Sequence, residues 1–164
     1  MSEIIITRAG LPDRAFIRSV SERTWPSTYG HIISQEQIDF MLDWMYSDDS
    51  LAEQFHKGHQ FYIASLNSED IGFCSVSAEA DQSHKLNKLY ILPSAQGTGA
   101  GSALLNKAIE VAKTKGSTSL FLQVNKHNSA YEFYLKKGFS KEGDFIFEIG
   151  NGFVMDDYIM RLQF

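Results

Sequence analysis

The chain has 164 residues, a length that fits one domain spanning residues 1–164. Its 43% hydrophobic and 21% charged residues are typical of a globular protein and exclude a disordered or collagen-like chain. The net charge of −5 makes nucleic acid an unfavourable partner, and neither a membrane span nor a secretory signal is recognisable. The single cysteine, Cys74, cannot form an internal disulfide, which is typical of a cytoplasmic protein.

Charge is unevenly distributed along the chain. Residues 85–138 carry eight lysines and two glutamates, for a net charge of +6. Residues 31–81 carry one lysine and ten carboxylates, for a net charge of −9. Such runs are usually solvated faces of helices. The alternative is that one region binds an anion and the other a cation.

The spacing of apolar residues predicts an α/β fold with a mixed sheet. The expected strands are residues 4–6, 61–66, 71–78, 86–92, 120–124, 139–149 and 153–162. The expected helices are residues 11–25, 34–45, 49–56, 99–116 and 129–136. Pro26 is expected to end or bend the first helix near Trp25. Short turns predict an antiparallel meander for strands two to four, and the long fourth helix predicts a parallel crossover between strands four and five.

A glycine-rich loop stands between the fourth strand and the fourth helix. It consists of Gln96, Gly97, Thr98, Gly99, Ala100 and Gly101. Glycines allow close backbone approach to a ligand, and the first N–H groups of a helix attract anions, so this loop is suited to a pyrophosphate. The alternative is a strand-to-helix turn without a ligand. A Walker A loop is disfavoured because no lysine follows Gly101, and a dinucleotide fold would place the loop after the first strand.

Two segments resemble the GNAT superfamily of acetyl-CoA-dependent N-acetyltransferases. The first joins Leu89–Pro93 to the glycine-rich loop, and the second, Asn128–Phe139, follows at the family's spacing. The resemblance implies a single GNAT-like domain with a mostly antiparallel sheet, splayed parallel strands four and five, and helices on both faces. Residues 25–29 and 155–160 resemble, more weakly, a bacterial branch that includes polyamine acetyltransferases.

The resemblance also implies roles for individual residues. The glycine-rich loop would hold the pyrophosphate of coenzyme A, and the edge formed by Leu89, Tyr90 and Ile91 would pair with its pantetheine arm. Tyr134 would be the acid that protonates the departing thiolate; the alternative is a core tyrosine. Many family members have asparagine at the position of His127. The contact to the cofactor from this turn is therefore left open, with the candidates Asn125, His127 and Asn128.

The general base has several candidates. Glu79, near the end of the third strand, is expected to face the acceptor; its alternative is an exposed turn carboxylate. Asp156 and Asp157 are adjacent in a predicted strand, so at most one of them can reach a shared site. A chain of water molecules is a further alternative.

These observations predict transfer of an acetyl group from acetyl-CoA to a primary amine, with a polyamine as one acceptor because of the acidic segment. The alternative is a non-catalytic acyl-CoA-binding or regulatory domain on the same scaffold. Trp25 and Tyr29, four residues apart, are either core residues or a wall of the acceptor pocket. No metal is expected, since His56 and His59 are the only close histidine pair. The oligomeric state, including a homodimer, is open.

Overall fold

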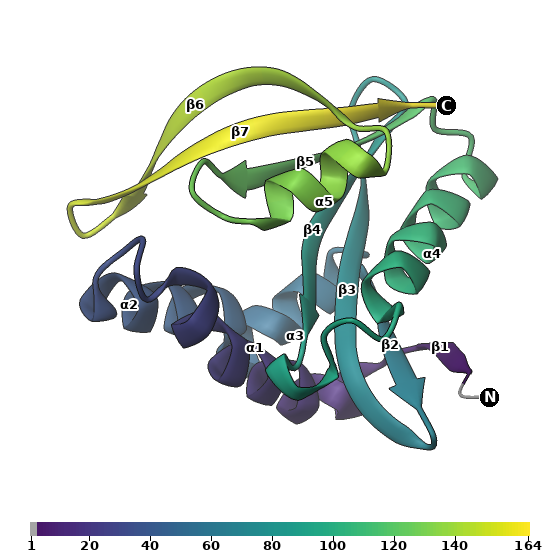
Figure 1. Ribbon diagram of the computed structural model, residues 1–164, viewed down its shortest axis with the longest axis horizontal. Coiled ribbons are helices and arrows are strands. Elements are labelled where there is room, and N and C mark those ends of the chain that lie inside the picture. The colour runs from purple at the N-terminus through teal and green to yellow at the C-terminus, as the bar shows by residue number, and fades with distance from the viewer. Residues whose placement is uncertain (1–2) are drawn as a thin grey trace.

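The computed structural model describes residues 3–164, which form one seven-stranded sheet with five α-helices. The strands are β1 (Ile4–Arg8), β2 (Gln60–Leu66), β3 (Glu69–Glu79), β4 (Ser83–Ile91), β5 (Ser119–Asn125), β6 (Ser140–Gly150) and β7 (Phe153–Gln163). The helices are α1 (Arg14–Tyr29), α2 (Gln35–Tyr46), α3 (Asp48–His56), α4 (Ala100–Thr114) and α5 (Ala130–Lys136). The spatial order of the strands is β1-β2-β3-β4-β5-β7-β6. Helices α1 to α3 cover one face of the sheet and α4 the other (Figure 1), so the predicted α/β fold is confirmed.

The meander of β2, β3 and β4 is antiparallel, as predicted. Its two connections are tight turns whose central residues have positive φ: Asn67 and Ser68 in one, Asp81 and Gln82 in the other. Such turns match the right-handed twist of the strands they join, and short polar residues tolerate this conformation well. The turn chemistry read from the sequence therefore sets the register of these strands.

The prediction that the first helix ends near Trp25 is wrong, because α1 continues through Pro26 to Tyr29. Proline removes one intrahelical N–H donor, which leaves the carbonyl of Glu22 without its usual partner. Glu22 and Pro26 are both exposed, so water can hydrogen-bond that carbonyl. The carbonyl of Pro26 still accepts from the N–H of Gly30 at 3.0 Å, and the added turn places Tyr29 against the sheet.

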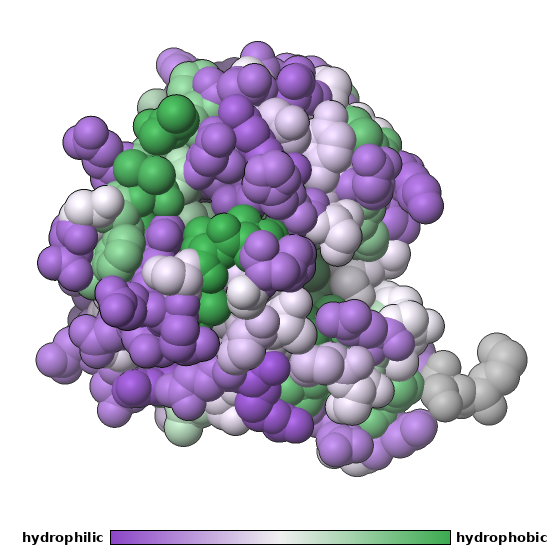
Figure 2. Space-filling view, turned by 60° about the vertical axis from the view of Figure 1, so that its left-hand side comes forward, coloured by the Kyte–Doolittle hydropathy of each residue, from purple (hydrophilic) through white to green (hydrophobic). Residues whose placement is uncertain are grey.

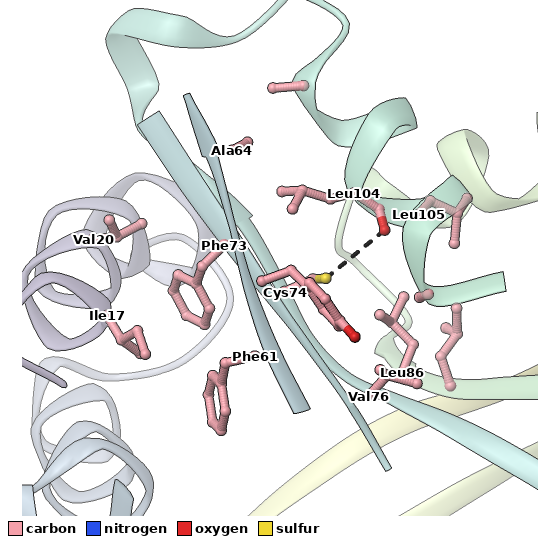
Figure 3. Packing of buried hydrophobic residues seen from close by; sticks show 14 of the residues in the cluster. Ile17, Val20, Phe61, Ala64, Phe73, Cys74, Val76, Leu86, Leu104 and Leu105 are labelled. Atoms are coloured by element: carbon pink, nitrogen blue, oxygen red, sulfur yellow. Dashed lines mark hydrogen bonds between the residues drawn. The ribbon is translucent and has the colours of Figure 1, made fainter. Parts of the chain in front are cut away.

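The core lies on both faces of the central strands. Phe61 and Phe73 pack toward Ile17 and Val20 of α1, whereas Cys74 points to α4 on the other side (Figure 3). The Cys74 thiol donates to the carbonyl of Leu104, with a sulfur-to-oxygen distance of 3.8 Å. Burial raises the pKa of this thiol to about 12, so it stays protonated and serves packing.

The β6–β7 hairpin reaches over α2 (Figure 1). The Gln37 side chain donates to the carbonyl of Val154 at 2.7 Å, and the rings of Phe40 and Phe153 lie 5.4 Å apart. These contacts hold the hairpin against α2. The surface in Figure 2 is mostly hydrophilic, with smaller hydrophobic areas between the polar side chains. Within residues 3–164, no helix has the length and apolar character needed to cross a membrane.

Candidate active site

Strands β4 and β5 separate part-way along their length. They pair in parallel only from Ser83 and Ser119 to Leu86 and Leu122. The separation begins at Asn87, which is the extra residue of a bulge: Leu86 pairs with Val76 of β3, but Lys88 pairs with the preceding residue, Ser75. From Asn87 to Ile91, β4 has no partner on its β5 side. The predicted splay is therefore confirmed, and it leaves backbone groups of β4 available to a ligand.

A narrow cavity of about 50 Å³ occupies the gap between the two strands, and we call it the slot. Its walls come from both strands, α1, α5 and the turn that precedes α5. The slot is lined by Tyr29, Leu86, Asn87, Lys88, Leu89, Tyr90, Leu122, Gln123, Val124, Asn128, Ala130 and Tyr134. An open groove of about 470 Å³ between α1, α4 and α5 adjoins the slot and shares with it Leu89, Tyr90, Asn128, Ala130 and Tyr134. Ile91 lines the groove but not the slot.

The glycine-rich loop adjoins this groove: Gln96 and Gly101 line it, and the whole loop lines a neighbouring cavity of about 310 Å³. Gly99 is the N-cap of α4 with φ +89°, and Gly97 has φ +82°, both in the left-handed region that favours glycine. A Cβ at either position would meet no atom within 4 Å, so the loop backbone faces open space. The Thr98 hydroxyl donates to the carbonyl of Ala95 at 2.8 Å and fixes the turn. The exposed backbone and the positive end of α4 suit an anionic group such as a pyrophosphate.

Tyr134 lies where the slot meets the groove and lines both. It is 7% exposed, and its ring packs edge-on against Phe133 and Phe139 at 5.3 and 5.5 Å. Burial raises the pKa of its hydroxyl, so the group is protonated at neutral pH. A phenol held in this state at the end of a slot can donate a proton to a leaving group.

The comparisons with known proteins agree with this geometry. Residues 31–160 match the Acetyltransferase (GNAT) domain family. An uncharacterised N-acetyltransferase of Mycobacterium bovis is 30% identical over 152 residues, which are 92% of this chain and 97% of that protein. The chain belongs to the GNAT family. The spermidine N(1)-acetyltransferase of Thermoplasma acidophilum is also 30% identical, over 155 residues covering 88% of this chain and 96% of that protein.

Solved structures support the same assignment. The PaiA N-acetyltransferase of Thermoplasma acidophilum, solved in complex with coenzyme A, is 27% identical, with a TM-score of 0.84 and 99% coverage of both chains. A GCN5-related N-acetyltransferase from Rhodopseudomonas palustris shares the fold, with a TM-score of 0.86 at 20% identity over 100% and 98% of the two chains. This GNAT chain is an N-acetyltransferase that uses acetyl-CoA, as the sequence predicted.

A second cavity, of about 370 Å³, opens on the opposite side of the splayed strands. We call it the acceptor cavity. It shares Tyr29, Leu86, Asn87, Lys88, Tyr90 and Gln123 with the slot, so the two meet at the splay. Its other lining residues are Trp25, Met41, Trp44, Met45, Tyr46, Lys85, Asn125, Phe147, Glu148, Ile149, Met155 and Asp157. Trp25 and Tyr29 therefore belong both to the core and to the cavity wall.

Two carboxylates line this cavity, the exposed Glu148 and the buried Asp157. Asp157 is 7% exposed, and its Oδ1 atom is buried without a hydrogen-bond partner among the described residues. Burial, reinforced by the charge of Asp156, raises the pKa of Asp157 to about 6. Such a group is ionised at neutral pH yet basic enough to take a proton from an amine.

The other base candidates lie elsewhere. Asp156 forms an ion pair with Lys126, as expected for neighbours on opposite faces of a strand. Glu79 is exposed at the end of β3 and lines a separate cavity with His84 and Lys115. The structure thus brings Asp157, but not Glu79, to the cavity that adjoins the slot. The eleven residues of β3 carry Glu79 to the end of the sheet away from Tyr90.

The three candidates for a cofactor contact in the turn before α5 lie in different places. Asn125 lines the acceptor cavity, and its side-chain oxygen accepts from the N–H of His127 at 2.9 Å. His127 is exposed at the edge of the groove. Asn128 lines both the slot and the groove, and its side-chain oxygen accepts from the N–H of Ala130. Of the three, Asn128 is best placed to contact a ligand that passes from groove to slot.

Two lysines in the acceptor cavity were not anticipated as site residues. Lys85 and Lys88 alternate with core positions of β4, and the sequence shows them only as part of a positive region. The negative region does not contribute to the cavity in the same way on α2. The α2 carboxylates Glu36, Asp39 and Asp43 are exposed and are absent from the cavity lining. Among residues 3–164, no group of three or more histidine, cysteine or acidic side chains is placed to hold a metal ion.

Proposed function

We propose that this enzyme acetylates a primary amine that enters the acceptor cavity, while acetyl-CoA occupies the groove and the slot. The supporting observation is that the two cavities share Tyr29, Lys88 and Tyr90, so that their contents meet at the splay of β4 and β5. The residues present fit the cosubstrate: the open glycine backbone would hold its phosphates, and the unpaired β4 backbone would pair with its amide-containing arm. When bound, acetyl-CoA supplies the acetyl thioester.

Two side chains would act as general base and general acid in this transfer. Asp157 would take a proton from the incoming ammonium or amine, directly or through water, since its carboxylate lines the acceptor cavity. Tyr134 would donate a proton to the departing sulfur from the other end of the slot. An N–H of β4 near Tyr90 or Ile91 would stabilise the developing oxyanion.

The test is release of the coenzyme A thiol from acetyl-CoA in the presence of a panel of primary amines. We expect amine-dependent release that is lost in Asp157→Asn and Tyr134→Phe. Binding of acetyl-CoA without thiol release for any amine would instead indicate the non-catalytic acyl-CoA-binding domain. A matched tertiary amine, which cannot form a stable acetamide, controls for general effects of an added base.

A polyamine is one candidate acceptor, suggested by the 30% identical spermidine N(1)-acetyltransferase. The acidic residues 31–81 also support it through long-range attraction of a polycation. Such attraction weakens with salt, so the apparent KM for spermidine should rise between low and high ionic strength. An unchanged KM would contradict this part of the proposal. We place the enzyme in the cytoplasm, on the support of its single, buried, unpaired cysteine.

A further inference from the structure

Two lysine side chains, Lys85 and Lys88, line the acceptor cavity, and the carboxylates of Glu79 and Asp157 act on Lys85 only from beyond ion-pair distance. Lys88 is 9% exposed, and its Nζ donates to Oε1 of Gln54 at 2.8 Å. Lys85 donates to Oε1 of Gln123 at 2.7 Å. Neither ammonium has a carboxylate within 4.0 Å among the described residues. Each lysine is therefore held in place by a neutral amide.

Several contacts fix the position of the Lys88 ammonium. The Gln54 amide donates to the backbone carbonyl of Met45 at 2.8 Å, which turns its oxygen toward the lysine. The ammonium also lies 5.3 Å from the ring centroid of Tyr46. These contacts position the charge without neutralising it. Burial, together with the charge of Lys85, accordingly lowers the pKa of Lys88 to about 7.

A buried cation without a counter-ion is unfavourable, and an anion that enters beside it relieves the cost of burial. The cavity also contains carboxylates: Asp157, which we assign as the base, and the exposed Glu148. The lining thus offers an acceptor for a proton and, separately, two donors for an anionic group. A polycation would have to approach both lysines.

We propose that Lys85 and Lys88 form the anion-binding part of the acceptor cavity, so that the preferred acceptor is an amine that also carries a carboxylate, as an amino acid does. This inference rests on the proposed function, since it assumes that the amine is acetylated at the splay. The amine of such an acceptor would face Asp157 while its carboxylate accepts hydrogen bonds from the two lysines.

The experiment compares acceptors that differ only in the anionic group. Glycine, β-alanine and 4-aminobutanoate are paired with ethylamine, propylamine and butylamine, and 1,4-diaminobutane represents the polycations. We expect the best amino acid to exceed its matched alkylamine in kcat/KM by roughly ten- to a hundred-fold, the range for charged hydrogen bonds. Lys88→Met should remove most of this preference, because the amino acid should lose more of its kcat/KM than its matched alkylamine does. Lys88→Arg should restore part of it.

Lys57→Met is the matched control, because Lys57 is exposed at the end of α3 and pairs with Glu53. It should leave every acceptor unchanged. Equal kcat/KM values for amino acids and alkylamines, a preference for 1,4-diaminobutane, or a preference that survives Lys88→Met would each overturn the inference. Absence of thiol release with every acceptor tested would instead overturn the proposed function. A thermal unfolding midpoint for each variant separates misfolding from loss of the anion contact.

Discussion

Lys126 and Asp156 form an ion pair in which Nζ and Oδ1 are 2.9 Å apart, beside the adjacent Asp157. Lys126 also lies 3.8 Å from Oδ2 of Asp144 on β6, so it joins β7 to its neighbouring strand. Because successive side chains on a strand point to opposite faces, this pairing leaves Asp157 alone on the cavity side. The two adjacent carboxylates therefore have different tasks: Asp156 holds the hairpin, and Asp157 is available for chemistry.

Asp157→Asn is expected to lower kcat/KM by roughly a hundred-fold or more, as for the loss of a positioned general base. In the wild type, Asp157 must be ionised to accept a proton, so the rate should rise with pH through the raised pKa of about 6. The asparagine variant should lose this inflection. The measurement is the pH dependence of kcat/KM for the best amine at saturating acetyl-CoA.

Asp156→Asn provides the matched control, one residue away on the same strand. Its carboxylate is half-exposed and paired with Lys126, so its loss should change kcat/KM by no more than about three-fold. The pH inflection should persist in this variant but move to a lower pH, because the charge of Asp156 contributes to the raised pKa of Asp157. Equal losses in the two variants would mean that the acidic pair acts only through the structure of β7.

The raised pKa of Asp157 also has a consequence for stability. The folded state binds the proton more readily than the unfolded state, whose carboxyl pKa is 3.8, so the stability of the fold decreases as the pH rises from about 4 to about 6. Asp157→Asn removes this penalty. We expect its unfolding midpoint to be a few degrees above the wild type at pH 7.5, with the difference shrinking toward pH 4. A variant that is less stable than the wild type at pH 7.5 would show that the Asp157 carboxylate stabilises the native cavity.

Much of the fold follows from local patterns. The meander was predictable because turn-forming residues such as Asn67 and Asp81 stand between runs rich in β-branched and aromatic residues. The continuation of α1 through Pro26 was not predictable, because it depends on how α1 packs and on whether Glu22 is exposed, so that water can replace the lost donor. The bulge at Asn87 leaves no signal in the sequence either, because it is defined only by the register with β3.

The groove and the acceptor cavity also differ in how far the sequence predicts them. The groove is built from contiguous motifs, so the glycine-rich loop and Tyr134 could be proposed from residue spacing. The acceptor cavity gathers side chains from α1, α2 and four strands that are distant in sequence. Whether Asp156 or Asp157 faces inward depends on strand register, and the burial of Lys88 depends on Gln54 of α3. Neither is encoded locally.

Tyr134→Phe is expected to lower kcat by roughly ten- to a thousand-fold while coenzyme A still binds. The change removes only the hydroxyl, and the ring can keep its contacts with Phe133 and Phe139. The control is Tyr131→Phe, one turn earlier on α5, where the ring packs against Tyr158 at 4.9 Å. Steady-state turnover and calorimetric titration with coenzyme A measure the two effects. Wild-type turnover in Tyr134→Phe would remove this residue from the mechanism.

Gly99→Val is expected to abolish binding of coenzyme A. The residue caps α4 with φ +89°, and the space into which a side chain would project is the space that a phosphate would need. Valine is strained at positive φ, so a loss of stability alone must be separated from a loss of the binding surface. Gly116→Val makes that separation: Gly116 follows the other end of α4 with φ +86°, and its Cβ would also meet no atom within 4 Å. Both variants should unfold at a lower temperature than the wild type, but only Gly99→Val should lose binding in a calorimetric titration performed well below either midpoint. If the two variants bound coenzyme A equally, the glycine-rich loop would not be the phosphate site, and the pyrophosphate would have to be sought along the groove between α1 and α5.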